Sequence, residues 1–491
     1  MNNTLFNKDN INKSDNNYDG NDDKIKDKNN VGNNGNGKLY YINGNIKYVG
    51  EFKDNKREGI GKEYYKDSKL KYEGEFKGGK YNGIGKEYYN GILIYEGEFK
   101  DDEYKGYGIE YYGGEVIYMG EFKSNEYDGM GKEYSNGILK YKGEFKNNES
   151  NGYGKCYHDN GELKYSGEFK NDLCYGYGSE YYDNKKLKYI GEFKNDEYNG
   201  IGKYYEDGKL IYKGKFKNDE KNGYGDYYDK GLLIYNGEFK DNERNGYGKE
   251  YNDNGELRYE GNFKDDKRHY AGKEYNDNGE LRYVGNYKED YYDGYGKYYY
   301  DGKLNYDGDF KNSKYTGNGK YYKDNILKYE GIFKDNERCG KGKEYINGKL
   351  LYDGNFKFDK VNGYGKLYYN NTDLKYEGEF KDNEKNGIGK EYYKGRKLKY
   401  DGNFKHNKWN GNGKEYYKDG ELKYKGEFKN NKYINHQHDD DKCLICMSEK
   451  KNIAFIPCGH LCICQKCSEI YIDKKCILCR KKYLNTNIIF Y

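Results

Sequence analysis

The sequence has few of the residues that build a deep globular core. Its 491 residues include one Pro and one Trp, and only 34% are hydrophobic. Much of that fraction is Tyr, which occurs 69 times, as often as Gly. A tyrosine presents an apolar ring and a polar tip, so it suits a surface that is half buried. The composition therefore excludes a thick aliphatic core and favours a thin, sheet-like architecture.

Long apolar runs and regions of one charge sign are also absent. No stretch approaches the roughly 18 apolar residues that cross a bilayer. The N-terminus continues into Asn, Asp and Lys instead of an apolar signal segment. The 88 basic and 84 acidic residues are mixed along the chain, which argues against nucleic acid as a partner. We expect a cytoplasmic protein with neither a signal peptide nor a transmembrane segment.

Cysteine is scarce in most of the chain and concentrated near its end. Eight of the eleven Cys lie between Cys443 and Cys479, and the other three are scattered. In a reducing compartment such a cluster is typical of a metal site rather than of disulfides. The C-terminal segment is therefore the first candidate for a functional site.

Two polar segments flank the regions with recognisable patterns. Residues 1–33 are rich in Asn, Asp and Lys, and they contain too few apolar side chains to offset the entropy of ordering. We expect these residues to be disordered. Residues 434–442 are also polar, and we expect them to be a linker.

Between these segments a unit of 23 or 24 residues recurs from Tyr48 onward. Each unit begins Tyr-x-Gly-x-Phe-Lys, as at Tyr72, and continues to Gly-x-Gly, as at Gly83. In the first part, apolar or small residues alternate with charged ones, which is the period of a half-buried β-strand. We expect a polar turn of about five residues, then a second strand through Gly83 to Tyr89. Successive hairpins would extend one antiparallel sheet.

The turn and glycine positions carry further predictions. Short units place Asn-Gly or Asp-Gly after the second strand, as at Asn90, and these dipeptides favour tight hairpin turns. A side chain at Gly74 or Gly85 would stand where the neighbouring unit's aromatic ring must lie, or where a strand bends. Tyr270 replaces a repeat glycine and Tyr287 replaces the repeat phenylalanine, so we expect local irregularity at both.

The recurring Tyr-x-Gly-x-Phe, Gly-x-Gly and period resemble the MORN (membrane occupation and recognition nexus) family across residues 34–433. The resemblance implies a mainly β fold, an elongated single-layer rod of antiparallel β-hairpins. In that family the repeats bind proteins, self-associate and in some members contact phosphoinositides. By resemblance the rod would recruit a protein substrate, and a phosphoinositide contact would place the chain at the periphery of a membrane.

The C-terminal segment has four pairs of metal-ligand residues at short spacing. Zinc favours four tetrahedral thiolate or imidazole ligands, so four pairs complete two sites and leave no open position for a catalytic water. We therefore expect two structural zinc ions. With so few apolar residues, metal binding must supply most of the folding free energy of this segment. The candidate ligands are Cys443, Cys446, Cys458, His460, Cys464, Cys467, Cys476 and Cys479.

The spacing resembles the RING finger, and Pro457 to Leu461 resemble the RINGs of inhibitor-of-apoptosis and Cbl-type ubiquitin ligases. The resemblance implies a small zinc-stabilised α+β domain over residues 443–482 with interleaved sites. One site would comprise Cys443, Cys446, Cys464 and Cys467, and the other Cys458, His460, Cys476 and Cys479. Cys462 is a surplus cysteine, which we expect to pack in the core. The alternative is that it replaces Cys464 as a ligand.

Resemblance to these ligases also implies a surface for a ubiquitin-charged conjugating enzyme. It would be formed by Ile445, by Ile470 or Tyr471 on a helix after the sixth ligand, and by Ile477 with Leu478. Arg480, the basic residue after the final Cys, would bridge enzyme and ubiquitin and is the candidate catalytic residue. Many active RINGs have Pro where this chain has Ile477, so this loop is less rigid.

The apolar tail, residues 483–491, resembles the tails through which this RING subgroup forms homodimers, with Ile489 and Phe490 as the candidate contacts. Two functions remain open. The first is a ubiquitin ligase whose rod recruits substrate. The alternative is a non-catalytic scaffold or membrane tether that uses its RING for dimerisation.

Overall fold

The computed structural model describes residues 34–369, 373–434, 442–456, 458, 460–471, 473, 475–480, 482 and 485–488. The expected disorder of residues 1–33, most of the linker 434–442, and the dimer contacts Ile489 and Phe490 lie outside the described residues. The strands belong to two compact units, one including β1–β21 and one including β23–β35 and the C-terminal segment.

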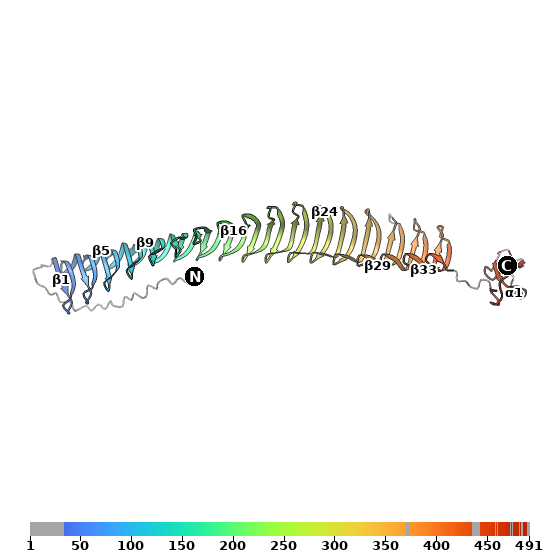
Figure 1. Ribbon diagram of the computed structural model, residues 1–491, viewed down its shortest axis with the longest axis horizontal. Helices are drawn as coiled ribbons and strands as arrows, with labels where there is room; N and C mark the ends of the chain where they lie inside the picture. Colours follow the sequence, from blue (N-terminus) through green and yellow to red (C-terminus); the bar gives the residue numbers. More distant parts are fainter. Residues whose placement is uncertain are drawn as a thin grey trace. The chain divides into compact units, whose positions relative to one another are not determined.

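The strands β1–β35 form one antiparallel sheet, as expected (Figure 1). Strands pair with the strand before them and the strand after them in the chain, as β4 does with β3 and β5. The even-numbered strands carry Tyr-x-Gly-x-Phe-Lys or its close variants. They are β2 Ile46–Lys53, β4 Leu70–Lys77, β6 Ile92–Lys100, β8 Glu115–Lys123, β10 Ile138–Lys146, β12 Leu163–Lys170, β14 Leu187–Lys194, β16 Lys209–Lys217, β18 Leu232–Lys240, β20 Leu257–Lys264, β22 Leu281–Lys288, β24 Lys303–Lys311, β26 Ile326–Lys334, β28 Lys349–Lys357, β30 Leu374–Lys381, β32 Leu398–Lys405 and β34 Leu422–Lys429.

The odd-numbered strands, apart from the two-residue β35, carry Gly-x-Gly or its variant. They are β1 Asn34–Tyr40, β3 Lys56–Tyr64, β5 Lys80–Tyr89, β7 Glu103–Tyr112, β9 Glu126–Ser135, β11 Glu149–Tyr157, β13 Leu173–Tyr181, β15 Glu197–Glu206, β17 Glu220–Asp229, β19 Glu243–Tyr251, β21 Lys267–Tyr275, β23 Tyr291–Tyr300, β25 Lys314–Lys323, β27 Glu337–Ile346, β29 Lys360–Tyr368, β31 Glu384–Tyr392, β33 Lys408–Tyr416 and β35 Lys432–Tyr433.

The glycines make room for the first tyrosine of their own unit. Gly74 on β4 lies directly opposite Gly85 on β5. A Cβ built at Gly85 would come within 2.5 Å of the Tyr72 ring, far closer than atoms can pack. The prediction that the ring belongs to a neighbouring unit was therefore wrong. Tyr72 pairs with Glu87 across the hairpin, and Gly74 pairs with Gly85 two positions further along the strands. The Tyr72 ring therefore folds back over the two glycines of its own hairpin.

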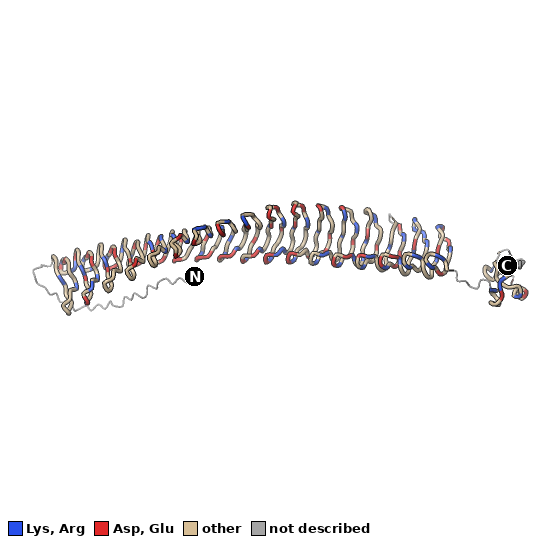
Figure 2. The backbone as a smooth tube through the Cα atoms, viewed as in Figure 1, with Lys and Arg blue, Asp and Glu red and all other residues tan. Residues whose placement is uncertain are grey.

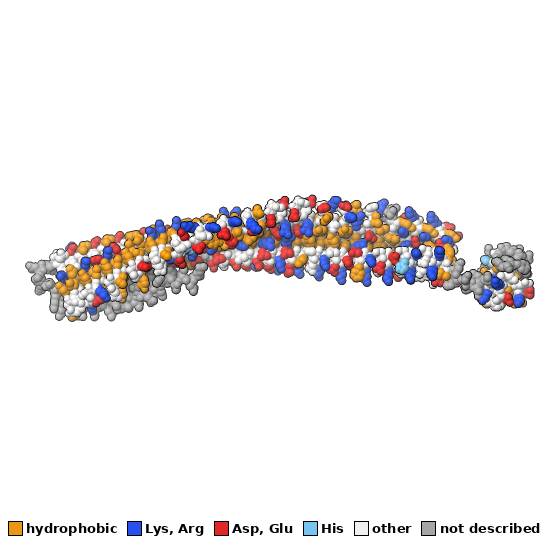
Figure 3. Space-filling view, in the orientation of Figure 1, with side chains coloured by type: hydrophobic (Ala, Val, Ile, Leu, Met, Phe, Trp, Pro, Cys, Tyr) orange, Lys and Arg blue, Asp and Glu red, His pale blue; other side chains and the backbone are white. Residues whose placement is uncertain are grey.

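Within each of the two compact units, the tyrosine and phenylalanine rings of successive repeats pack against one another and form a continuous aromatic core. The Tyr72 ring is fully buried and meets Phe76 edge-on at 5.1 Å and Phe99 of the next repeat at 5.0 Å. Edge-to-face contacts are a favourable arrangement for aromatic pairs. The Tyr72 hydroxyl donates a 3.0 Å hydrogen bond to the Glu75 carbonyl, so the polar tip of the ring has a partner. The space-filling view shows hydrophobic side chains gathered in a band across successive strands (Figure 3).

The residue that covers each tyrosine ring varies between repeats. Tyr81 stacks on Tyr72 with a centroid distance of 3.8 Å. At the equivalent position Arg268 lies over Tyr259 at 4.6 Å, a cation–π contact. This exchange of an aromatic for a cation was not predicted, because it depends on which residue faces the ring across the hairpin.

The first turn of each repeat is shorter than expected. It has two residues instead of about five, as at Asp101–Asp102, and both have positive φ, 54° and 72°. Such a turn suits Asn and Asp, which tolerate the left-handed region. Asp102 also joins neighbouring repeats: its Oδ1 accepts a 2.8 Å bond from the Tyr81 N–H, and its N–H donates to the Tyr81 carbonyl at 3.1 Å. The tight Asn90–Gly91 turn is confirmed, with φ of 53° and 83°.

The two substituted positions behave differently. Tyr287 is 3% exposed and meets Tyr283 edge-on at 5.1 Å, so it occupies the place of the repeat phenylalanine without irregularity. Tyr270 adopts a φ of 57°, a backbone conformation that suits glycine, and its ring is 59% exposed. The expected irregularity is confirmed at Tyr270 and wrong at Tyr287.

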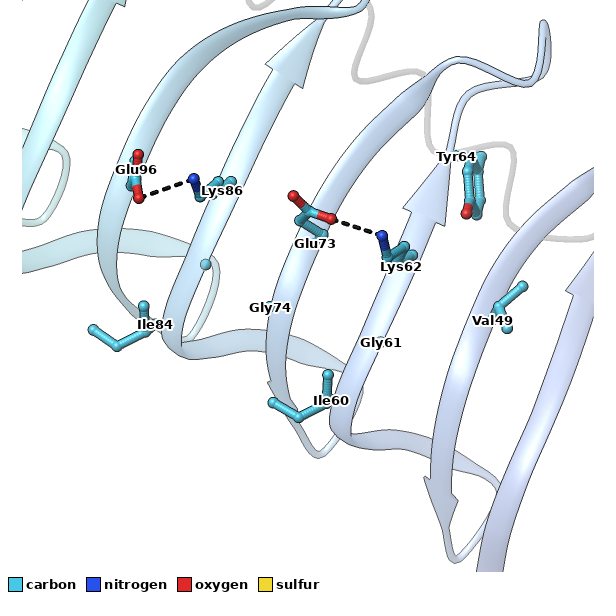
Figure 4. Close-up of a pocket in the computed structure, with 11 residues that line it drawn as sticks. Val49, Ile60, Gly61, Lys62, Tyr64, Glu73, Gly74, Ile84, Lys86 and Glu96 are labelled. Carbon is cyan, nitrogen blue, oxygen red and sulfur yellow. Dashed lines mark ion pairs between the residues drawn. The ribbon is translucent and has the colours of Figure 1, made fainter.

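The face opposite the aromatic core carries a row of side chains that we call the charged row. It consists of the residue before the glycine on each even strand and the residue after the second glycine on each odd strand. From β3 to β6 it alternates in sign: Lys62 pairs with Glu73 at 2.9 Å and Lys86 with Glu96 at 3.0 Å (Figure 4). Both signs occur along both units of the chain (Figure 2).

Candidate metal centre

The first and last ligand pairs lie in two turns of the same geometry. The Met447 N–H donates to the Cys443 carbonyl at 2.9 Å, and the Arg480 N–H donates to the Cys476 carbonyl at 2.8 Å. Met447 and Arg480 both take the left-handed conformation, with φ of 60° and 61°. Each turn thus directs two thiols to one side, as a tetrahedral metal requires.

A hairpin and a short helix place the other two pairs. β36 (Ile453–Ile456) pairs with β37 (His460–Ile463), and β38 (Asn485–Ile488) pairs with β36 on its other edge. The helix α1 (Gln465–Ile470) is capped by Cys464, whose Sγ accepts the Cys467 N–H at 3.4 Å.

The position of this helix corrects one expectation. The resemblance placed it after the sixth ligand, Cys467, whereas α1 contains that ligand and ends before Tyr471. The reason is the cap: Cys464 satisfies a free N–H in the first turn, so the helix starts immediately after it.

The eight predicted ligands gather in two interleaved clusters, with the ligand atoms of each cluster within 4.8 Å of one another. Tetrahedral zinc with Zn–S bonds of about 2.3 Å places two sulfurs about 3.8 Å apart. The Cys446 and Cys464 sulfurs are 3.8 Å apart, and His460 Nδ1 is 3.7 Å from the Cys476 sulfur. The donor sets therefore fit two zinc ions. The clusters are Cys443, Cys446, Cys464 and Cys467, and Cys458, His460, Cys476 and Cys479.

The protein environment favours the thiolate form at the exposed ligand Cys446. Hydrogen bonds from the Ser448 side chain, then from the backbone N–H groups of Glu449 and Ser448, lower the pKa of the Cys446 thiol to about 5. Zinc binds the thiolate, so these donors support the same protonation state that the metal needs.

The surplus Cys462 is a core residue. It is fully buried, and its Sγ lies 3.4 Å from the His460 carbonyl oxygen and 3.9 Å from the Cys476 sulfur. Cys464, and not Cys462, joins the first cluster, which confirms the preferred assignment. Cys462 packs there with Ile453, Phe455 and Ile463 in a small core between the two metal sites.

The residues predicted to contact a conjugating enzyme divide by exposure. Ile445, Ile470 and Leu478 are 40%, 69% and 58% exposed. Ile477 and Tyr471 are partly buried against the zinc-site core, and the Tyr471 hydroxyl donates to the Lys475 carbonyl at 3.0 Å. In the turns at Cys443 and Cys476 the first intervening residue, Leu444 or Ile477, packs inward and the second faces solvent.

Two further side chains flank these turns. Arg480 is exposed, and its Nη1 lies 3.8 Å from Asp473 Oδ2. Met447 is 65% exposed and was not predicted as a contact residue. Its position corresponds to that of Arg480 in the other turn, a relation that the matching left-handed φ reveals and the sequence alone does not.

Comparison with known families agrees with this geometry. Residues 439–486 match the zinc finger, C3HC4 type (RING finger). Sixteen segments between residues 48 and 421, together more than half of the chain, match the MORN repeat, and residues 203–218 also match a MORN repeat variant. The chain belongs to the MORN-repeat family. It combines a MORN array with a C-terminal RING finger that holds two zinc ions.

Similarity to individual proteins covers short stretches of this MORN–RING chain. It is 38% identical over 58 residues to "E3 ubiquitin-protein ligase RNF26" of Mus musculus, which is 11% of this chain and 14% of that protein. It is 43% identical over 42 residues to "E3 ubiquitin-protein ligase SP1" of Arabidopsis thaliana, which is 9% of this chain and 12% of that protein. It is 40% identical over 50 residues to "Putative apoptosis inhibitor 021L" of Invertebrate iridescent virus 3, which is 10% of this chain and 24% of that protein.

No helix in the described part of the chain has the length and apolar character needed to cross a bilayer.

Proposed function

We propose that this protein is a RING-type ubiquitin ligase. The observation that carries the proposal is the RING finger itself, in which two complete zinc sites hold exposed apolar residues on turns of fixed geometry. Two of the relatives described above are named E3 ubiquitin-protein ligases, which supports the same activity. Because protein ligands fill both zinc sites, the metals are structural and take no part in the chemistry.

The conjugating enzyme would bind to the two Cys-x-x-Cys turns and to the end of α1. Ile445 and Leu478 occupy equivalent solvent-facing places in the turns, and Ile470 is exposed at the end of the helix. We assign the main contacts to these three residues. Ile477 and Tyr471 would support the surface from beneath, since both pack against the zinc-site core.

Catalysis in such a ligase is positioning. A lysine amine of the substrate attacks the thioester that joins ubiquitin to the conjugating enzyme. A C–N bond forms, the C–S bond breaks, the enzyme's cysteine leaves as a thiolate, and the amine loses a proton. Arg480 is exposed beside the last ligand, and its planar fork of donors suits carbonyl oxygens on both enzyme and ubiquitin. It would hold the thioester in a reactive pose.

The remaining parts of the chain would supply the partners. We propose that the MORN array over residues 34–433 recruits the substrate, and that the RING over residues 443–482 recruits the charged enzyme. Homodimerisation through Ile489 and Phe490 of the tail 483–491, and phosphoinositide contact by the array, remain predictions.

Autoubiquitination of the purified chain with a panel of conjugating enzymes tests the proposal. The wild type should form ubiquitin conjugates, and Ile445→Ala and Arg480→Ala should each lose most of the rate. Arg480→Lys should fall between Arg480→Ala and the wild type, because it keeps the charge and loses the fork. Ile60→Ala, an exposed apolar residue on the sheet, is the matched control and should leave the rate unchanged.

Zinc content and circular dichroism establish that each variant is folded. A wild-type chain that holds two zinc ions yet forms no conjugates with any enzyme of the panel would contradict the ligase proposal. It would favour the alternative, a scaffold whose RING serves dimerisation alone.

A further inference from the structure

The charged row normally balances its own charge. In the second unit of the chain its residues alternate strictly in sign from Lys297 on β23 to Lys414 on β33. Ion pairs result, such as Lys297 with Asp307 at 3.4 Å and Lys343 with Glu330 at 3.6 Å. Opposite charges that face each other across strands stabilise a sheet.

In the first unit this alternation breaks over ten consecutive strands. From Ile109 on β7 to Lys213 on β16 the row contains five lysines and no carboxylate. Three of the lysines are adjacent: Lys142 on β10 lies directly opposite Lys132 on β9 and Lys155 on β11. Neighbouring strands are about 4.8 Å apart, so three positive charges line up over about 10 Å.

None of these three lysines has an ion-pair partner among the residues that the structure describes. Lys142 and Lys155 are exposed and Lys132 is half-buried. Like charges directly opposite each other destabilise a sheet. Pairs of facing lysines also occur at Lys203 with Lys213 and at Lys414 with Lys425, but only here do three lysines lie side by side in the row. The fold therefore tolerates its longest run of like charges here, and an anion placed on the row would relieve the repulsion.

The surroundings of the lysines indicate the kind of anion. Met130 and Tyr153, beside them on the same face, are 52% and 63% exposed. The Glu121 and Glu144 carboxylates also lie beside the row, where they accept the N–H groups of Met130 at 3.3 Å and Tyr153 at 3.4 Å. Glu75 makes the same contact with Ile84 where the row is balanced, so these carboxylates are a constant feature and do not compensate for the extra lysines.

This mixture of positive, apolar and negative groups fits a protein segment better than a continuous polyanion. A nucleic acid or a flat anionic membrane would bring phosphates against the Glu121 and Glu144 carboxylates. In an extended segment, alternate side chains share one face and lie about 6.8 Å apart. Acidic side chains could then reach the lysine row, and apolar side chains between them could cover Met130 and Tyr153.

We propose that Lys132, Lys142 and Lys155 form a binding site for an extended acidic segment of a partner protein. The site belongs to the sheet and does not depend on the ligase proposal, because binding needs neither the RING nor a conjugating enzyme. Where the ligase proposal also holds, such a segment would identify the substrate.

Fluorescence anisotropy of the full-length chain with a labelled peptide tests the site. The probe alternates Glu with Val, and its control replaces every Glu with Gln. The Glu peptide should bind more tightly, and added salt should weaken its binding. The triple variant Lys132→Gln, Lys142→Gln, Lys155→Gln should weaken it about tenfold, from the loss of several ion pairs.

The balanced part of the same row provides a matched control. The triple variant Lys297→Gln, Lys320→Gln, Lys343→Gln removes the same number of charges from equivalent positions and should leave peptide affinity unchanged. Lys142→Glu restores the alternation, so it should raise the melting temperature while it weakens binding. If the lysines served only the stability of the sheet, a variant that raises the melting temperature would not weaken peptide binding.

Several results would overturn the proposal. One is equal affinity for the Glu and Gln peptides; another is a first triple variant that binds as tightly as the wild type. Phosphatidylinositol bisphosphate vesicles and single-stranded DNA complete the panel. Binding of either through these lysines, without binding of the Glu peptide, would show that the partner class is wrong.

Discussion

The MORN sheet and the RING finger solve the problem of a small hydrophobic content in opposite ways. The sheet distributes its stability over many equivalent contacts, with one buried tyrosine, one edge-on phenylalanine and two facing glycines in almost every repeat. The RING concentrates its stability in two metal sites and a core of a few residues around Phe455 and Cys462.

This difference sets how far damage should spread. In a repeat array each unit contacts only its neighbours, so a defect remains local and lowers stability by the energy of a few interfaces. In a metal-dependent domain the loss of one ligand removes a large part of the folding free energy at once. The predictions below test that contrast, beginning with the largest effect.

Removal of one zinc ligand should unfold the RING and leave the sheet intact. Cys464→Ser deprives the first site of one of its four ligands, and apparent zinc-binding free energies of such sites are about 10 kcal/mol or more. Limited proteolysis should cut the C-terminal segment while circular dichroism retains the β-sheet signal. Cys462→Ser, a change at the buried cysteine outside the clusters, is the control and should keep two zinc ions by native mass spectrometry.

A methyl group at a repeat glycine should destabilise one hairpin and little else. Gly85→Ala places a Cβ against the Tyr72 ring, and overpacking of this kind costs about 1–3 kcal/mol. Hydrogen exchange should accelerate in β4, β5 and their neighbours, and distant strands should exchange at the wild-type rate. Gly91→Ala is the comparison: its Cβ meets nothing within 4 Å, so only the turn should be affected. Faster exchange throughout the sheet after Gly85→Ala would contradict the local picture.

The aspartate that joins neighbouring repeats should contribute less. Asp102→Gly keeps the positive φ and removes the acceptor of the Tyr81 N–H, a loss of about 1 kcal/mol. Asp101→Gly changes the adjacent turn residue, whose side chain accepts no hydrogen bond within the described structure. The difference between the two variants in local hydrogen exchange near Tyr81 measures the contact between repeats. Equal effects would mean that the side chain of Asp102 matters only for the turn.

The smallest expected effect is a pH dependence of the balanced row. The Lys62 hydrogen bond, assisted by Tyr88, lowers the pKa of Glu73 below its usual value. Because the folded pKa is depressed, the stability from this carboxylate is present above the unfolded pKa and is lost as pH falls through the folded value. For an exposed pair this amounts to at most about 0.5 kcal/mol. The difference between the denaturant midpoints at pH 7 and pH 3 should be slightly smaller in Glu73→Gln than in the wild type, and an unchanged difference would contradict the assignment.

Much of the sheet could be predicted because the repeat period can be read directly from the sequence. Alternation around Tyr72 and Phe76 indicated strands, and Asn90–Gly91 indicated a tight turn. The sequence could not predict which repeat's tyrosine ring covers each pair of glycines, since this depends on the register that sets Gly85 opposite Gly74. The same holds for Asp102, whose partner Tyr81 lies in the preceding repeat.

The metal site shows the same division. Ligand spacing was enough to predict all eight ligands, because Cys-x-x-Cys geometry is local. The sequence did not predict that Met447 and Arg480 occupy equivalent left-handed positions, or that Ile477 packs inward while Leu478 faces solvent. These features follow from the path of the backbone through each turn, which the side-chain pattern does not record.

The alternating part of the charged row has a consequence for how such a chain can change in length. Each repeat there contributes one strand with a lysine and one strand with an acid, as Lys320 and Glu330 illustrate. A duplicated or deleted whole repeat leaves every neighbour opposite in sign, whereas a single added strand would set two like charges face to face. The number of repeats can therefore change at little electrostatic cost in this part of the sheet. The ten strands from β7 to β16 lack the alternation, so repeats there cannot be exchanged for one another without changing which charges face each other.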